Sequence, residues 1–278
     1  MGTLLLGRLC HPRDRGVGMS GVRRGWERSS LVVAPLVFAT AFMAVWEMFV
    51  RVFDIKRFLL PSPSSIAIAV GDNFGRIRDG VEVTGGNAVY GLVVGSALAV
   101  GSALLASRWR WFSDVTTPLA TGMAAVPIVS LAPVFNIWFG STDPFSRRLV
   151  VIIVVFFPVF VNTTKGLTQI DPIHAELMHS LVASDWDFIR RVRIPNALPF
   201  VMSSLRVASS LAIISAIVAE YFGGTQGSLG QVITQSAGLS RFDIAWAAVL
   251  GASVVGIALL AAVSVLEWVA MPWRRRTG

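Results

Sequence analysis

The sequence is poor in cysteine and in charged residues. Its single cysteine, Cys10, excludes an intrachain disulfide and a metal site built from several cysteines. Charged residues make up only 14% of the 278 residues, whereas hydrophobic residues make up 54%. A soluble domain of this length carries more charge and fewer apolar residues. The composition therefore predicts an integral membrane protein.

Sequence signatures of an enzyme are also absent. No Gly-x-x-x-x-Gly-Lys-Ser/Thr phosphate loop occurs, so we expect no ATP site of that kind in this chain. His174 and His179 are five positions apart, which places them on different faces of a helix and argues against a shared metal. No serine, histidine and aspartate follow a recognisable catalytic motif. We therefore expect neither catalysis nor a bound cofactor in this chain itself.

The formal net charge of +8 does not predict a nucleic-acid-binding protein. The arginines lie at the ends of apolar segments and are not interleaved with aromatic residues in a basic patch. Cations in that position suit the cytoplasmic surface of a membrane. We expect the lipid bilayer, and no nucleic acid, to be the partner of these charges.

Apolar segments of membrane-spanning length recur along the chain. A helix needs about 20 mostly apolar residues to cross a bilayer core, and six segments approach that length. The third and the sixth are long enough to tilt or to include interfacial turns. The sequence predicts an all-α integral membrane protein with six transmembrane helices. The predicted spans are 31–53, 87–107, 115–139, 149–166, 198–222 and 243–270.

The distribution of Lys and Arg predicts the orientation of these spans. Cytoplasmic loops of membrane proteins carry an excess of both residues. If the N-terminus is cytoplasmic, the inner regions hold nearly twice as many of them as the outer loops. We therefore expect both termini to be cytoplasmic. The chain then divides into a basic arm (1–30), a membrane domain (31–270) and a basic tail (271–278).

Small residues recur at intervals of four in several predicted spans. Such ridges let helix backbones approach closely in lipid. They predict a tightly packed bundle but do not identify its function. The ridges are Gly91, Gly95 and Ala99 in the second span, Ser204, Ala208, Ala212 and Ala216 in the fifth, and Ala248, Ala252 and Gly256 in the sixth.

Among the ionisable residues inside the predicted spans are Glu47, Arg206 and Glu220. Glu47 can pair with Arg51 four residues later, and Arg206 can extend toward the cytoplasmic face. For Glu220 two interpretations stay open, a gating or docking residue and an interfacial residue. The lack of a mid-membrane carboxylate argues against a proton- or sodium-coupled carrier.

Prolines interrupt the third predicted span. Pro127 and Pro133 free backbone carbonyls that neighbours or cavity water must satisfy, and Asn136 follows near the outer end. A kinked helix that lines a pathway and a kink that serves packing are both consistent with this pattern. Pro127, Pro133, Asn136 and Glu220 are the candidate pathway or gate residues.

The stretch 171–199 mixes charged and apolar residues between two apolar spans. It predicts two short helices. The first begins at Pro172 and runs to about residue 182, with an apolar stripe of Ile173, Leu177 and Leu181. The second begins at a Ser-x-x-Asp cap, Ser184 and Asp187, and ends near Pro195. An amphipathic helix pair lying on the membrane is one interpretation.

The same stretch resembles the "EAA" coupling loop of permease subunits of bacterial ABC importers. Glu176-Leu177-Met178 stands at the position of the family's Glu-Ala-Ala triplet, Val182 at the position of its glycine, and Ile194-Pro195 at its end. A β-branched valine disfavours the left-handed turn of a glycine, so we expect the bend at 183–185. The resemblance implies a coupling loop at 171–195. Its candidate coupling residues are Ile173, Ala175, Glu176, Leu177, Met178, Leu181, Val182, Ala183, Ser184, Ile194 and Pro195.

Three further motifs resemble the same family. They are Leu-Pro-Ser-Pro at 60–63, the proline-containing stretch 125–140, and Val-Ala-Glu at 218–220 with the glycine-rich segment after it. They match the branch that imports sulfonates, taurine, nitrate, and thiamin or flavin precursors. The third span and the coupling loop look most like permeases for riboflavin or thiamin-pyrimidine precursors.

The resemblance implies a type I ABC importer-like bundle in the bacterial inner (cell) membrane, whose coupling loop is moved by a separate ATPase. The implied partners are cytoplasmic ABC ATPase subunits that bind ATP and Mg²⁺, a second copy of this permease, and an extracytoplasmic solute-binding protein. Two other functions stay open at this point, an ATP-independent channel or pore subunit, and a membrane enzyme or assembly factor.

Overall fold

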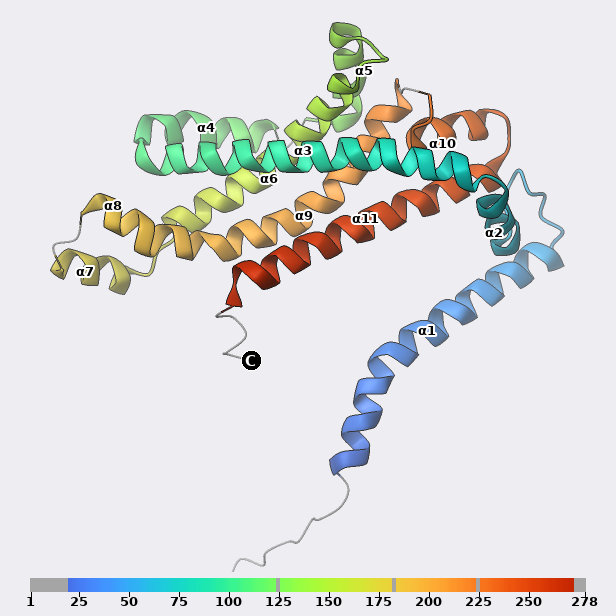
Figure 1. Ribbon diagram of the computed structural model, residues 1–278, viewed down its shortest axis with the longest axis horizontal. Helices are drawn as coiled ribbons and strands as arrows, with labels where there is room; N and C mark the ends of the chain where they lie inside the picture. Colours follow the sequence, from blue (N-terminus) through green and yellow to red (C-terminus); the bar gives the residue numbers. More distant parts are fainter. Residues whose placement is uncertain (1–19, 124–125, 182–183, 224–225, 273–278) are drawn as a thin grey trace, which may run out of the picture. The chain divides into compact units, whose positions relative to one another are not determined.

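The computed structural model describes residues 20–123, 126–181, 184–223 and 226–272 (Figure 1). The chain forms two units, 1–54 and 55–278. In the first unit, the helix α1 (Ser20–Val52) carries Pro35 within its length. Glu47 and Arg51 pair on one face of α1, as the sequence predicts, with an N–O distance of 2.6 Å. Most of the apolar side chains of α1 from Val33 onward are exposed, as expected for a helix that faces lipid.

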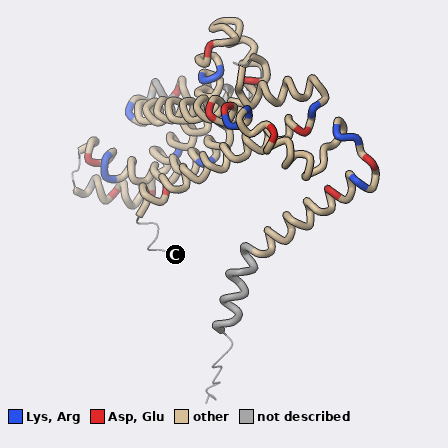
Figure 2. Tube along the Cα trace, turned by 45° about the vertical axis from the view of Figure 1, so that its right-hand side comes forward, with Lys and Arg blue, Asp and Glu red and all other residues tan. Residues whose placement is uncertain are grey.

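All the secondary-structure elements in the described part of the second unit are helices. Five of the helices in the described part of the whole chain, α1 included, are long and apolar enough to cross a membrane. Figure 2 shows charged residues gathered near helix ends and in the region of α7 and α8. The elements of the second unit are α2 (Pro63–Asp72), α3 (Phe74–Arg108), α4 (Arg110–Met123), α5 (Ile128–Phe139), α6 (Pro144–Thr168), α7 (Pro172–Ser180), α8 (Asp185–Phe188), the π-helix η1 (Ile189–Arg193), α9 (Ile194–Tyr221), α10 (Leu229–Gly238) and α11 (Phe242–Ala270).

Helices α3, α6 and α9 form the centre of the second unit. The predicted glycine ridge of α3 lies against α6, because a Cβ on Gly95 would stand 2.8 Å from the carbonyl oxygen of Ile152. On α9, Ala208, Ala212 and Ala216 are fully buried. Small residues therefore set the close approach of these helices, since hydrophobic burial contributes little to helix association in lipid.

Helix α11 packs beside α9, and α10 and α2 lie near its first turns (Figure 1). Leu229, Val232 and Ile244 form a separate buried cluster there with the alanines of α11. Helix α10 was not expected from the glycine-rich sequence. Ser228 starts it as an N-cap whose hydroxyl accepts a hydrogen bond from the backbone N–H of Gln231.

The third predicted span, 115–139, is broken into two helices and not only kinked. The chain forms α4 and α5 instead, and Pro127 has an extended conformation at the N-cap of α5. Proline disfavours helical geometry in the residue before it, which explains a break at this point. Helix α4 begins directly after α3 ends, and α5 ends near Gly223, just beyond α9. The two short helices together run between the two ends of the unit.

Other predicted spans hold, with different boundaries. Helix α3 starts thirteen residues before the predicted position 87, and α6 starts at Pro144 because Asp143 caps it with a carboxylate that accepts from the N–H of Phe145. Arg147 and Arg148 therefore lie inside α6, whereas the predicted span began after them, at residue 149.

Candidate functional site

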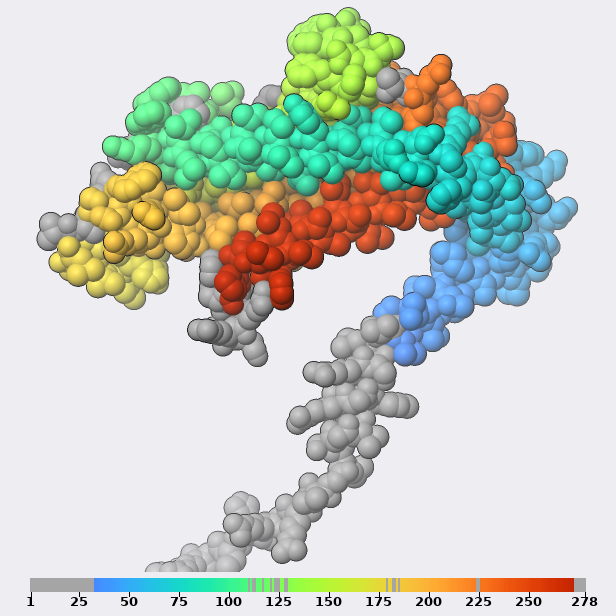
Figure 3. All heavy atoms as spheres, viewed as in Figure 1, coloured from blue at the N-terminus to red at the C-terminus, as the bar shows by residue number. Residues whose placement is uncertain are grey.

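The coupling loop (171–195) projects at one end of the second unit (Figure 3). Its first helix, α7, begins at Pro172 as predicted and ends at Ser180. The apolar stripe is uncovered, with exposed fractions of 71% for Ile173, 56% for Leu177 and 66% for Leu181. Glu176 is also exposed, whereas Ala175 and Met178 are half-buried. An uncovered apolar stripe of this kind is suited to a partner's groove.

The predicted cap of the second helix is present. The Ser184 hydroxyl donates to the Asp187 carboxylate at 2.6 Å, and the Asp187 N–H donates back to Ser184 at 3.2 Å. Val182 and Ala183 lie outside the described residues. Helix α7 ends at Ser180 and α8 begins at Asp185, and the bend expected at 183–185 falls partly outside the described residues.

The expectation that Pro195 ends the second helix is wrong. The chain stays helical from Asp185 to Tyr221, and Pro195 lies in the first turn of α9. The π-helix just before it explains this, because the Ile194 N–H bonds the carbonyl of Ile189, five residues back. The wider turn accommodates the proline ring and its missing N–H. Ile194 and Pro195 are both exposed.

Two side chains fasten the base of the coupling loop to the bundle. Arg193 donates to the carbonyl of Ser107 at the end of α3, at 3.0 Å. Asn196 donates to the carbonyls of Gly166 and Gln169 at the end of α6, at 2.8 and 2.9 Å. Beside them lies an apolar cavity of about 440 Å³, lined by Leu104, Ser107, Arg108, Trp186, Ile189 and Ile194. Movement of the coupling loop would therefore reach α3, α6 and α9 directly.

At the other end of the unit, where α9 ends and α3 and α11 begin, Glu220 is only 1% exposed. We call this end the distal end. The Glu220 carboxylate accepts hydrogen bonds from the Thr84 hydroxyl (2.8 Å), the Asn87 amide (3.3 Å) and the Gly230 N–H (3.2 Å). The start of α10 and the side of α3 cover Glu220, so its carboxylate is exposed neither to lipid nor to an outer partner in the described structure. Both interpretations from the sequence stay predictions.

Arg147 is a second buried charge at the distal end, 1% exposed, which the sequence analysis missed. Its guanidinium donates to the carbonyls of Ser141 (2.9 Å), Gly223 (3.3 Å) and Thr142 (3.4 Å). The Asp-Pro dipeptide before it, a typical helix start, would have placed it inside a span. Thr84 was missed because the start of α3 was placed too late, and Asn87 was placed only at the very end of that predicted span.

The candidate pathway residues of the third predicted span do not form one cluster. Asn136 lies at the distal end, where its carbonyl oxygen accepts from the Ser146 hydroxyl at 2.9 Å. Pro127 stands at the break before α5 and Pro133 lies within α5. No contact with Glu220 is shown for either proline in the described part of the chain.

Arg206, which the sequence predicts can extend toward the cytoplasmic face, has a partner on a neighbouring helix. It pairs with Glu267 of α11. This ion pair joins the cytoplasmic halves of α9 and α11 in the predicted orientation. A paired charge fits the general rule that ionisable residues within spans neutralise each other.

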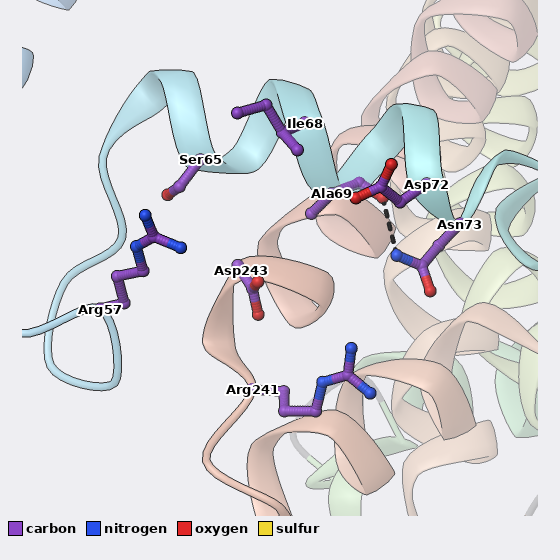
Figure 4. A pocket seen from close by; sticks show the side chains of 8 residues that line it. All are labelled: Arg57, Ser65, Ile68, Ala69, Asp72, Asn73, Arg241 and Asp243. Atoms are coloured by element: carbon purple, nitrogen blue, oxygen red, sulfur yellow. Dashed lines mark hydrogen bonds between the residues drawn. The ribbon is translucent and has the colours of Figure 1, made fainter.

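A polar surface pocket of about 370 Å³ lies at the distal end, between α2 and the start of α11 (Figure 4). Two arginines and two aspartates line it. Among the described residues, no side-chain hydrogen bond or ion pair is formed by Arg57, Asp72 or Arg241. These three charges are therefore available to a partner. The lining residues are Arg57, Ser65, Ile68, Ala69, Asp72, Asn73, Arg241 and Asp243.

Known proteins with similar sequences are transport permeases. The chain is 30% identical over 259 residues to a formylaminopyrimidine transport permease protein, ThiX, of Halalkalibacterium halodurans, covering 90% of this chain and 99% of that protein. It is 26% identical over 258 residues to a putative aliphatic sulfonates transport permease protein, SsuC, of Bacillus subtilis, covering 91% and 89%. It is 25% identical over 233 residues to a riboflavin transport system permease protein, RibX, of Chloroflexus aurantiacus, covering 83% and 86%.

A solved structure shares the fold. The crystal structure of an amino acid ABC transporter with histidines aligns with a TM-score of 0.59 at 16% sequence identity, over 72% of this chain and 96% of that chain. This likeness shows the type I importer-like arrangement of helices. Residues 91–270 match the family model described as "Binding-protein-dependent transport system inner membrane component". That match covers more than half of the sequence, so this multi-pass membrane protein belongs to the family of permease subunits of binding-protein-dependent ABC importers.

Proposed function

We propose that this permease imports a small heterocyclic metabolite, with a formylated aminopyrimidine or riboflavin as the first candidates. The support is the 30% identity to a permease named for formylaminopyrimidine and the 25% identity to one named for riboflavin. Because another relative is named for aliphatic sulfonates, a sulfonate is the competing candidate substrate. Uptake of labelled formylaminopyrimidine, riboflavin and an alkanesulfonate by cells with and without the chain would identify the class. Uptake of the sulfonate alone would refute the heterocycle.

The observation that carries the proposed mechanism is the uncovered stripe of α7. A cytoplasmic ATPase that holds ATP and Mg²⁺ grips Ile173, Leu177 and Leu181 in an apolar groove, and Glu176 accepts a hydrogen bond or a charge from it. The other candidate coupling residues shape this contact. ATP-driven closure of two ATPase subunits moves the loops of two copies of this chain. Because Arg193 and Asn196 fasten the loop to α3 and α6, the movement reaches the membrane helices.

The remaining partners follow from the same proposal. Both termini and the coupling loop face the cytoplasm, and the distal end faces outward. A solute-binding protein docks there, where the charged pocket with Arg57 and Arg241 offers unpaired side chains to its surface. Asn136 lies at this end beside the buried Glu220, and with Pro127 at the break before α5 and Pro133 within α5 it makes up the proposed pathway or gate region.

Substitution of the α7 stripe tests the ATPase contact. Leu177→Asp or Glu176→Lys should abolish both solute uptake and co-purification of the ATPase. Each variant puts a repelling or unpaired charge into the contact, which should weaken the binding free energy by about 3–5 kcal/mol. Leu239→Asp is the matched control, since Leu239 is 71% exposed at the distal end. The measurement is ATPase recovered with the tagged permease from membranes. An ATPase that co-purifies equally with Leu177→Asp and wild type would refute the contact.

A further inference from the structure

The two buried charges of the distal end, Glu220 and Arg147, join helices that are far apart in the sequence. The hydrogen bonds of Glu220 connect α9 with α3 and α10. Those of Arg147 connect α6 with the loop before it and with Gly223, two residues after the end of α9. Neither side chain is exposed to lipid or solvent in the described structure, so neither is placed to contact a transported solute there.

Glu220 holds the beginning of α10. The Gly230 N–H points at its carboxylate, and the Leu229 N–H donates to the Thr84 hydroxyl at 3.0 Å, which itself donates to Glu220. A carboxylate at the first turn of a helix satisfies free N–H groups and suits the helix dipole. The fit is tight, because a Cβ on Gly230 would lie 2.6 Å from the Cβ of Glu220.

Arg147 holds the loop between α5 and α6. Three backbone carbonyls converge on its guanidinium, two from the loop and one from Gly223. The end of α9 and the end of α5 are close at this point, because a Cβ on Gly223 would lie 2.6 Å from the Asn136 amide nitrogen. Asn136 also accepts from Ser146, the residue before Arg147. The loop, α5 and α9 therefore meet around one side chain.

Burial of a charge is unfavourable unless fixed partners replace water. The partners named above are backbone groups and short side chains from other helix ends and from the loop before α6, so these hydrogen bonds hold only while those segments keep their positions. We propose that Glu220 and Arg147 are positioning residues for access switching: they keep the distal ends of α3, α5, α6, α9 and α10 together as one body throughout the transport cycle. This inference rests on the proposed function.

A disulfide across the Arg147 contact tests whether these ends stay together. A Cβ built on Gly223 lies 3.4 Å from the Cβ of Ser141, close to the spacing of about 3.5–4.5 Å that a disulfide requires. The variant Ser141→Cys/Gly223→Cys is made with Cys10→Ser, which removes the native thiol. Complexes are purified through a tag on this chain with whatever ATPase accompanies it. Gly223→Cys alone is the control for crowding at Asn136.

The proposal expects the disulfide to form equally without nucleotide and with Mg-ATP plus vanadate. It also expects ATP hydrolysis by the oxidised and reduced complexes to agree within about two-fold, because a contact that never opens can be locked without slowing the cycle. Disulfide formation in only one of the two conditions would overturn the proposal. So would ATP hydrolysis that stops on oxidation and returns on addition of reductant.

A rescue experiment tests the positioning role of Arg147 itself. Arg147→Gln should reduce ATP hydrolysis by the purified complex about ten-fold or more, because the loop loses its fixed partners, and the oxidised Ser141→Cys/Gly223→Cys pair should restore it. A disulfide that forms in this background without restoring hydrolysis would refute the role. If the Arg147→Gln protein does not fold, the locked variant with native Arg147 still decides the proposal. Absence of ATPase from the wild-type complex would instead refute the proposed function.

Discussion

Replacement of Glu220 by alanine should destabilise the folded permease by about 3–5 kcal/mol, the loss typical of removing one partner from a buried charged network. Three donors would lose their acceptor at once, from Thr84, Asn87 and the Gly230 N–H. Each of these donors is buried, so a donor left without its acceptor adds to the loss. The measurement is the midpoint of unfolding of the purified chain in a detergent–denaturant titration.

Glu82→Ala is the control for Glu220→Ala. Glu82 is a carboxylate on α3 whose side chain is 64% exposed and pairs with Arg78 four residues earlier. An exposed pair of this kind contributes little, about 0.3–0.5 kcal/mol. We therefore expect an unfolding midpoint close to wild type for Glu82→Ala. Equal midpoints for the two alanine variants would show that the Glu220 network does not stabilise the distal end.

A leucine in place of Gly95 should prevent α3 and α6 from packing against each other. We expect a large loss in the yield of folded protein. Even a Cβ at this position would lie 2.8 Å from the Ile152 carbonyl oxygen and 3.2 Å from the Ile152 Cα. Both neighbours are backbone atoms of a helix, so they cannot turn aside as a flexible side chain could. Overpacking by a few methylenes already destabilises a core by about 1–3 kcal/mol, and here the two helices would have to separate.

Gly101→Leu is the control for the Gly95 variant. Gly101 lies on the same helix, six residues later, and a Cβ there meets nothing within 4 Å. The same side chain is added to the same helix, and only its surroundings differ. We expect the Gly101 variant to be recovered from membranes in wild-type amounts, as judged by size-exclusion chromatography. If Gly95→Leu gave the same monodisperse peak, the close α3–α6 crossing would be wrong.

Local sequence patterns were sufficient where a residue's role depends on its near neighbours in the chain. The apolar length of the spans, the start of α7 at Pro172, the Ser184–Asp187 cap and the Glu47–Arg51 pair all follow from spacings of a few residues. The glycine ridge of α3 also predicted a close helix crossing, because only small residues allow one in lipid. The motifs of the coupling loop and the later spans were enough to indicate the family.

Helix boundaries near proline were not predictable in this way. A proline such as Pro195 is expected to end a regular α-helix. Here the π-helical turn at Ile189–Arg193 precedes it, and the helix continues past the proline. Pro127 did interrupt the third predicted span, whereas Pro118 and Pro133 lie within helices. The same residue type therefore gives different outcomes, because neighbouring helices and turn geometry decide how the lost hydrogen bond is replaced.

The sequence by itself determined that this chain crosses a membrane, that it has no phosphate loop of its own, and that 171–195 carries an apolar stripe with a basic end. Composition and short-range periodicity contain that information. Only the tertiary structure decided the surroundings of Glu220 and revealed Arg147. Thr84 and Glu220 are 136 positions apart and Arg147 and Gly223 are 76 apart, and only the packing of the helices brings each pair together.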